Sequence, residues 1–444
     1  MKQFVALLFS VVSVVLKLCL VTPTYIGDSA SFVSIFLLFE LVFWLVLNCR
    51  RHKSLNKVIV AVIFPFISFV YLNTPLFMFP LDILPYNFSN NSIVYSLQLL
   101  TVSSTICFLA FFFLFSQSLV GVLFRKIKNE LKLFQVTKIG IWLFIIIGTG
   151  VALLYLYNFY SSGAYLYAGN ASRLEVINAA ETGKTWLLQY IFSAWVIVAF
   201  LCFTSNTGKF TRIHMAFVLL IIIAFLVPYV QLGNRRELAS IILFLLVLQC
   251  VKGNAVKALL PLGILIPVVL VVGYFRQSTS ELILSDFLVS VFGEFLFPHT
   301  TLIYGIEFGS PMYLGTSIYT GFIYFLPSLG LWDKGLSLAQ QFSLDYGGGM
   351  MGYGYTPYAE MFVNFGASAV VLFPFIIASL IYVLIRIRSS NWLPIFILCF
   401  SLDINRGEFA SIFMQLLIYV ILATVLIRTL NVGRDEKFSS SSYQ

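Results

Sequence analysis

Apolar residues fill most of the chain in long runs, which short polar or charged connections separate. A helix that crosses a membrane needs roughly 20 consecutive apolar residues, because the hydrocarbon core of a bilayer is about 30 Å thick. A window of that length predicts twelve membrane-spanning helices. They cover residues 4–21, 31–48, 58–75, 96–117, 136–160, 186–204, 213–231, 237–251, 258–275, 366–385, 391–404 and 409–427.

The composition supports an all-α polytopic membrane protein. Hydrophobic residues make up 60% of the 444 positions and charged residues only 10%, whereas soluble domains contain about 25% charged residues. The chain therefore has too few charges to cover the surface of a soluble globule. Its net charge of +9 would suggest nucleic acid as a partner of a soluble protein, but here we expect the lipid bilayer and no nucleic acid.

The charges between the predicted spans alternate in sign along the chain. Twelve spans place both chain ends on one side, where the connections carry nineteen lysines and arginines and three acids. The opposite side carries seven lysines and arginines and fourteen acids. Because positive residues collect in cytoplasmic connections, we expect both termini to be cytoplasmic.

One outer connection is much longer than usual for a folded domain. It covers residues 276–365 and is rich in aromatic residues and glycine, which indicates a folded segment. We expect interfacial or re-entrant helices there, over the outer mouth of the helix bundle. Two further spans at 287–306 and 312–331, giving fourteen in total, are the alternative. The expected organisation is a nine-span bundle (1–275), a large periplasmic loop (276–365), three spans (366–428) and a cytoplasmic tail (429–444).

Arginines occur at the outer ends of three predicted spans. The span at 237–251 has 15 residues and covers only about 22 Å at 1.5 Å per residue. Arg235 and Arg236, which precede it, are therefore expected at or just inside the hydrocarbon boundary. The same argument places the turn D-I-N-R-G-E (403–408) at a similar depth, and Arg276 follows the ninth span. We expect these guanidinium groups to lie at one level of the membrane.

Two interpretations of these arginines are open. A charge near the centre of a membrane helix costs about 2.5–3.5 kcal/mol on insertion scales, so such groups need partners or a function. In one interpretation the arginines form ion pairs that fix the helices, joining Arg235, Arg236 and Arg406 to Glu237, Glu408 and Asp403. In the other, which we favour, they form an outward-facing anion site, because guanidinium binds phosphate oxygens through two parallel hydrogen bonds.

The segment D-Y-G-G-G-M-M-G-Y-G-Y-T-P-Y-A-E-M-F-V-N-F-G (345–366) combines glycines with tyrosines. Glycine lets a backbone approach a ligand closely, and tyrosine rings offer flat surfaces for sugar rings. Tyr353, Tyr355 and Tyr358 are thus candidate substrate-binding residues, with an aromatic belt at the outer interface as the alternative. We expect Glu360 to face the mouth where the arginines meet.

His299 is the only histidine expected on the outer side, and it is a weaker candidate for an acid or base. It has no cysteine or histidine neighbours at the spacing of metal ligands. The chain also contains no G-x-x-x-x-G-K-[ST] phosphate loop and no D-x-D motif. We therefore expect no metal and no cofactor.

Three motifs resemble those of a known family. These are G-N-R-R-E (233–237), G-G-G-M-M-G-Y-G-Y-T-P-Y-A-E-M-F-V-N-F-G (347–366) and R-G-E-F (406–409). In their order and spacing they resemble the Wzy-type oligosaccharide repeat-unit polymerases, which make O-antigen or capsule in bacteria. The resemblance also covers the plan of ten to fourteen spans with a large late periplasmic loop.

The resemblance implies a metal-independent glycosyltransferase in the bacterial inner membrane. It would join oligosaccharide repeat units carried on undecaprenyl diphosphate at the periplasmic face, so that the lipid-linked oligosaccharide is both donor and acceptor. A chain-length regulator protein is the expected partner. The alternatives are a lipid-linked oligosaccharide flippase or other transporter, and an O-antigen ligase.

The candidate arginines and glutamates receive expected roles under this resemblance. Arg235, Arg236, Arg276 and Arg406 would bind the diphosphate and stabilise its charge as the glycosidic bond to it breaks. Glu360 would be the general base. Glu408 and Glu237 would orient the arginines.

Overall fold

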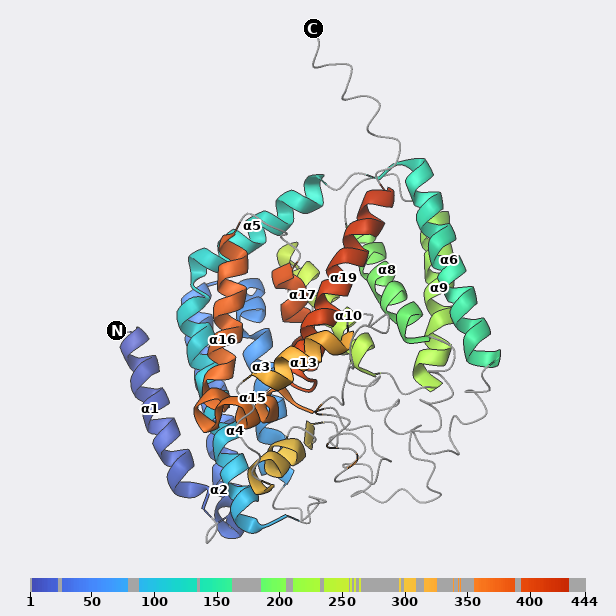
Figure 1. Ribbon diagram of the computed structural model, residues 1–444. Helices are drawn as coiled ribbons and strands as arrows, with labels where there is room; N and C mark the ends of the chain where they lie inside the picture. Colours follow the sequence, from blue (N-terminus) through green and yellow to red (C-terminus); the bar gives the residue numbers. More distant parts are fainter. Residues whose placement is uncertain are drawn as a thin grey trace, which may run out of the picture. The chain divides into compact units, whose positions relative to one another are not determined.

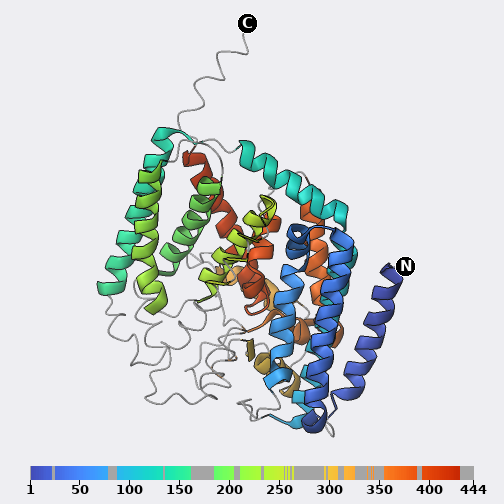
Figure 2. The same ribbon diagram turned by 180° about the vertical axis from the view of Figure 1, so that it is seen from behind.

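The structure is a computed structural model (Figures 1 and 2). It describes residues 2–22, 26–78, 88–133, 136–161, 185–204, 211–231, 235–254, 299–308, 315–325, 355–387 and 393–430, with a few isolated residues between them. Nearly all of these residues are helical, and no β-strand occurs within these ranges.

Fifteen helices have defined bounds in the described part of the chain. They are α1 (Lys2–Leu20), α2 (Ile26–His52), α3 (Leu55–Met78), α4 (Asn90–Leu114), α5 (Gln117–Leu133), α6 (Lys138–Ser161), α8 (Thr185–Thr204), α9 (Arg212–Gln231), α10 (Arg235–Val251), α13 (Thr316–Phe325), α15 (Pro357–Phe365), α16 (Ala367–Arg386), α17 (Leu393–Cys399), α18 (Ser401–Ile404) and α19 (Phe409–Leu430).

Helices lie at all but one of the predicted spans. The exception, 258–275, falls almost entirely outside the described residues. The predicted span 391–404 differs from the expectation, because it is divided into the two short helices α17 and α18. Within the predicted loop 276–365, α13 has ten residues and is about 15 Å long at 1.5 Å per residue, half the thickness of the hydrocarbon core.

The fold is that of an all-α, multi-pass membrane protein. Seven helices in the described part of the chain are long and apolar enough to cross a membrane. Their outer faces carry exposed large apolar side chains, such as Val11 of α1 and Leu153 of α6. A soluble protein would bury such faces, whereas lipid solvates them.

The helices form two compact units. The first contains residues 1–123, 253–255 and 281–414, and the second contains 124–252, 256–280 and 415–444. The division expected along the sequence, into membrane bundle, periplasmic loop and final spans, stays a prediction.

In the first unit, α4 is the central helix and packs against α1, α2, α3 and α16. Trp44 of α2 stacks on Phe108 of α4, with ring centroids 5.7 Å apart. The buried hydroxyls of α4 mostly donate to carbonyls one turn earlier, as Ser103 does to Leu99 at 2.7 Å, so that polar residues are tolerated in an apolar helix. Ser103 also donates to the carbonyl of Val370 in α16 at 3.1 Å.

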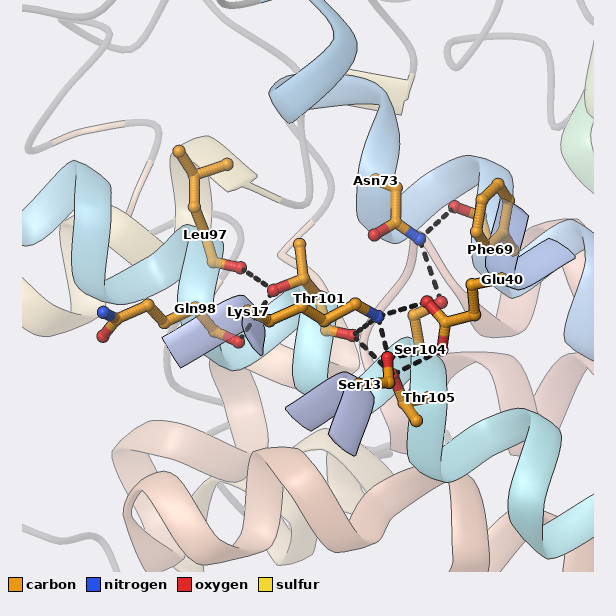
Figure 3. A network of polar contacts seen from close by, with 10 residues as sticks. All are labelled: Ser13, Lys17, Glu40, Phe69, Asn73, Leu97, Gln98, Thr101, Ser104 and Thr105. Carbon is orange, nitrogen blue, oxygen red and sulfur yellow. Dashed lines mark hydrogen bonds and ion pairs between the residues drawn. The ribbon is translucent and has the colours of Figure 1, made fainter. Parts of the chain in front are cut away.

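A buried ion pair joins three helices of the first unit (Figure 3). Lys17 of α1 pairs with Glu40 of α2 at 2.6 Å, and both side chains are 0% exposed. The Lys17 ammonium also donates to the carbonyl of Thr101 at 2.9 Å and to the hydroxyl of Thr105 at 2.6 Å, both in α4. Glu40 in turn accepts from Thr105 at 2.7 Å and from Ser13 at 3.1 Å. All three ammonium hydrogens thus have acceptors, as a charge buried in an apolar setting requires.

In the second unit, α6 packs against both α8 and α9, and α10 packs on α8. Trp195 of α8 stacks on Phe144 of α6 at 4.8 Å, and its indole N–H donates to the Phe144 carbonyl at 2.8 Å. Gly148 leaves room for this ring, since a Cβ there would overlap the indole. Tyr155 of α6 stacks on Phe225 of α9 at 4.2 Å.

Candidate functional site

The short helix α15 presents the candidate base Glu360. The Thr356 hydroxyl caps the helix by accepting the N–H of Ala359 at 3.3 Å, and Pro357 occupies the first helical position. Both residue types are typical of helix starts. Glu360 lies in the first turn, where the helix dipole favours a negative charge. At the other end Gly366 adopts φ 80° and ψ −171°, a conformation that glycine alone adopts readily, and the chain turns into α16, which runs crosswise to α15 (Figure 1).

The second part of the site is the turn at 403–408, between α18 and α19. The carbonyl of Asp403 accepts the N–H groups of Arg406 and Gly407, each at 3.0 Å, which closes the turn tightly. The Glu408 carbonyl accepts the N–H of Ile412 at 2.9 Å and starts α19. The turn thereby holds Asp403, Arg406 and Glu408 as buried side chains.

Two hydrogen bonds join α15 to this turn. The Glu360 carboxylate accepts the backbone N–H of Phe409 at 2.6 Å, and the Tyr358 hydroxyl donates to the Asn405 side chain at 3.0 Å. Asn405 in turn donates to the Ser401 carbonyl at 2.6 Å. Residues 355–366, the described part of the segment 345–366, therefore meet the turn at 403–408 in the first unit.

Burial dominates the electrostatics of Glu360, whose side chain is 1% exposed. It raises the pKa of Glu360 to about 8, because a buried carboxylate loses its hydration. The Phe409 N–H lowers this pKa in part, and the negative charge of Glu408 raises it further. A carboxyl group with a pKa close to neutral pH can both accept and release a proton.

The charged residues of the turn are not isolated. Asp403, Arg406 and Glu408 are at most 9% exposed, and each has an interaction partner. The arrangement is therefore compatible with ion pairs that fix the helices and with an anion site that uses Arg406.

Further hydrogen bonds anchor α15 to its surroundings. Asn364 donates to Ser317 of α13 at 2.6 Å and accepts the N–H of Gly315 at 2.9 Å. The Thr356 hydroxyl lies 3.1 Å from that of Thr301. These contacts fix the position of the helix that carries Glu360.

The structure buries the other aromatic and histidine candidates in the first unit. Tyr358 packs edge to face on Phe373 of α16 at 5.2 Å, and Tyr355 packs on Phe342 at 6.2 Å. His299 is fully buried, with its Nε2 3.4 Å from the Ile93 carbonyl. The contacts of these side chains in the described structure are with protein, and their expected contact with a substrate stays a prediction.

The side chains of the other arginine candidates lie outside the described part of the structure. Arg235, Arg236 and Glu237 begin α10 of the second unit, but only the backbone is described at these positions. Arg276 and Tyr353 lie outside the described residues. The expected meeting of guanidinium groups from three connections therefore stays a prediction.

Several polar residues of the first unit were given no role by the sequence. The side chains of Asn364 and Asn405 make hydrogen bonds that connect the segments of the site. The feature of the sequence that could have revealed them is a side-chain amide within a largely apolar stretch. Lys17 and Glu40 lie inside predicted spans, and a single charge in each of two successive spans is the signal that could have paired them. Among the described residues, no group of three His, Cys, Asp or Glu side chains could hold a metal ion.

No protein-family model, curated protein or solved structure matches the chain. The fold and the site therefore define its class: a multi-pass helical membrane protein in which a buried carboxyl group meets a charged turn.

Proposed function

We propose that the protein is a polymerase of undecaprenyl-diphosphate-linked oligosaccharide repeat units. It would act in the bacterial inner membrane with both termini in the cytoplasm and the site facing the periplasm, during synthesis of O-antigen or capsule. The observation that supports this most is the contact of Glu360 with the N–H of Phe409. It joins a buried acid of raised pKa to a turn that carries a buried arginine.

In this proposal the reaction is a single displacement at the anomeric carbon. The hydroxyl oxygen at the non-reducing end of the acceptor forms the new bond to that carbon while its bond to the diphosphate breaks. Glu360 takes the hydroxyl proton, and undecaprenyl diphosphate leaves with the bonding electron pair. Because the diphosphate is a good leaving group, no separate acid is required.

Arg406 would stabilise the charge that develops on the diphosphate. A well-placed donor in a low-dielectric site contributes about 3–4 kcal/mol to transition-state stabilisation. Arg235, Arg236 and Arg276 would complete the diphosphate site, and Glu237 and Glu408 would orient these guanidinium groups. We assign Tyr358 and Asn405 to positioning α15, because their hydrogen bond links α15 to the turn.

The raised pKa of Glu360 supports a proton-transfer role. At pH 7 a group of pKa about 8 is mostly protonated, so the active carboxylate form is a minority. The rate is therefore expected to rise with pH up to about 8 and then level off. Glu360→Gln should abolish both the activity and this pH dependence.

Reconstitution tests the function directly. The full-length protein in liposomes is given lipid-linked repeat units, and the products are separated by size. A ladder of longer glycans is the expected result. Transfer only to a lipid A core acceptor would instead identify an O-antigen ligase, and movement across the bilayer without new bonds would identify a flippase.

A matched variant controls for the loss of a carboxyl group. Glu307 is an exposed acid that, like Glu360, accepts a backbone N–H, that of Ser89 at 3.0 Å. Glu307→Gln should retain the ladder, whereas Glu360→Gln should lose it. Equal activity in both variants would exclude Glu360 as the base.

A further inference from the structure

Polar atoms without partners gather where α2 turns into α3. In the described part of the chain, Nη1 of Arg51, both ring nitrogens of His52 and Oδ1 of Asn56 are buried without a hydrogen bond. The His52 side chain is 1% exposed. Because buried polar groups in proteins are nearly always hydrogen bonded, three such side chains within six residues indicate a bound group that satisfies them.

The backbone of this turn offers further donors. Lys53 adopts φ 55°, the left-handed conformation that ends many helices, and its N–H donates to the Cys49 carbonyl at 3.3 Å. Helix α3 then starts from Ser54, whose carbonyl accepts the N–H groups of Lys57 and Val58, each at 3.0 Å. The first N–H groups of a helix have no acceptor within it, and that end carries partial positive charge.

The side-chain charges around the turn are positive. Arg51 and Lys57 are the charged groups that act on His52. The Arg51 guanidinium lies over the Phe112 ring, 4.4 Å from its centre. Arg50 and Lys53 are exposed on the same turn. Neither Arg51 nor Lys57 has an ion-pair partner in the described part of the chain.

We propose that this turn binds a phosphate group. A phosphate offers several acceptor oxygens, and the turn offers Nη1 of Arg51, one ring N–H of His52, the Lys57 ammonium and the first N–H groups of α3. The amide of Asn56 presents its NH₂ to the same group when its two ends are exchanged. Helix starts combined with arginine are established phosphate-binding elements.

The position of the turn places the phosphate site at a membrane surface. Both α2 and α3 are long and apolar enough to cross a membrane, so the turn between them lies at a membrane surface, where lipid phosphates are found. The headgroup of an anionic phospholipid and a soluble phosphate ester share this chemistry. The site does not depend on the proposed glycosyl transfer, because it uses none of the residues assigned to that reaction.

The test uses the full-length protein in a maltoside detergent with two separate probes, phosphatidylglycerol and inorganic phosphate. Native mass spectrometry counts the lipid molecules that the protein retains. The midpoint of thermal unfolding is measured with each probe, and the measurement with inorganic phosphate is compared with one in sodium chloride of equal ionic strength. We expect one probe to bind and to raise the midpoint. Binding of phosphatidylglycerol alone identifies a lipid headgroup, and binding of inorganic phosphate identifies a soluble phosphate ester.

Neighbouring arginines provide a matched pair of variants. Arg51→Gln removes the guanidinium whose Nη1 is buried and should weaken binding about tenfold, as expected for the loss of one hydrogen bond to a charged group. Arg50→Gln removes the same charge from the exposed side of the turn and should bind as the wild type does. Equal weakening in both variants would indicate a diffuse positive field and would overturn the site.

Two further variants keep the test valid if Arg51→Gln does not fold. Phe112→Leu removes the ring under Arg51 but no donor, and it should retain binding, whereas Lys57→Gln should weaken it. A wild-type protein that binds neither probe, or a Lys57→Gln variant that binds as tightly as the wild type, would overturn the proposal.

Discussion

At the scale of single residues, the position of Glu360 couples its proton to the stability of the fold. Its pKa is about 8 in the folded protein, against an ordinary value of 4.5. Between these two pH values the folded state holds a proton that the unfolded state releases. The contribution of Glu360 to stability is therefore most favourable below about pH 4.5 and is lost as the pH rises through 8, by at most about 1.4 kcal/mol per pH unit.

Glu360→Gln should remove this pH dependence, because an amide does not titrate. We expect the midpoint of thermal unfolding of the variant, relative to that of the wild type, to increase from pH 5 to pH 8. Thermal unfolding in detergent at several pH values measures this difference. Glu307→Gln should follow the wild type throughout. A constant offset between Glu360→Gln and the wild type would show that Glu360 does not titrate in this range.

Arg406 provides a second test at this scale. Arg406→Lys keeps the charge but loses the planar fork that binds two phosphate oxygens at once. In the liposome assay we expect activity to fall about a hundredfold, the order expected when one well-placed donor is lost, while expression is maintained. Arg428→Lys, an exposed arginine at the other end of α19, should have no effect. Full activity of Arg406→Lys would exclude a diphosphate-binding role.

The sequence indicated part of this site. Glu360 and the turn at 403–408 were candidates because a charge in an apolar chain requires a partner or a function. In the structure Glu360 accepts the N–H of Phe409, which directly follows this turn. The hydrogen bond between Tyr358 and Asn405 could not be foreseen. It depends on the exact approach of two segments 47 residues apart, which a hydropathy pattern does not encode.

At the scale of helices, small and polar residues attach α1 to its neighbours. The buried side of α1 consists of Ala6, Ser10, Ser13 and Lys17, while its large apolar residues are mostly exposed. Between membrane helices, small and polar residues carry the packing, because lipid solvates large apolar side chains equally well.

Lys17 and Glu40 should therefore depend on each other. Lys17→Met alone leaves the Glu40 charge buried without its partner and should destabilise the protein by about 3–5 kcal/mol. The double variant Lys17→Met, Glu40→Leu should recover most of this loss, because two apolar residues replace the pair. Denaturant unfolding of the wild type, both single variants and the double variant gives the coupling energy. Additive losses would show that the two residues do not interact.

Helix positions were predictable, but helix neighbours were not. Hydropathy located α3 and α4 within a few residues, because the length of a span is set by the bilayer. The packing of α4 on α16 joins segments more than 250 residues apart, and the apolar residues that face lipid and protein are alike in composition. The division of the span 391–404 was likewise not visible, since both of its pieces are apolar.

At the scale of the whole molecule, the charge bias predicts which side each connection faces. In a variant without its native cysteines, Lys53→Cys should lie in the cytoplasm and Asn91→Cys outside it, because α3 separates the two positions and both are exposed. A maleimide reagent that cannot cross membranes should label only Asn91→Cys in intact cells and both after lysis. The reverse pattern would invert the orientation and place the turn at 403–408 on the cytoplasmic side.

The pairing of Lys17 with Glu40 also constrains how the protein is made. A lone lysine in the last turn of the first helix is poorly tolerated by lipid when its side chain is buried, and its counter-charge is carried by the very next helix to leave the ribosome. The two segments gain most by entering the bilayer together as a hairpin that is already neutral. The hydroxyls of α4 can then complete the coordination once that later helix has been synthesised.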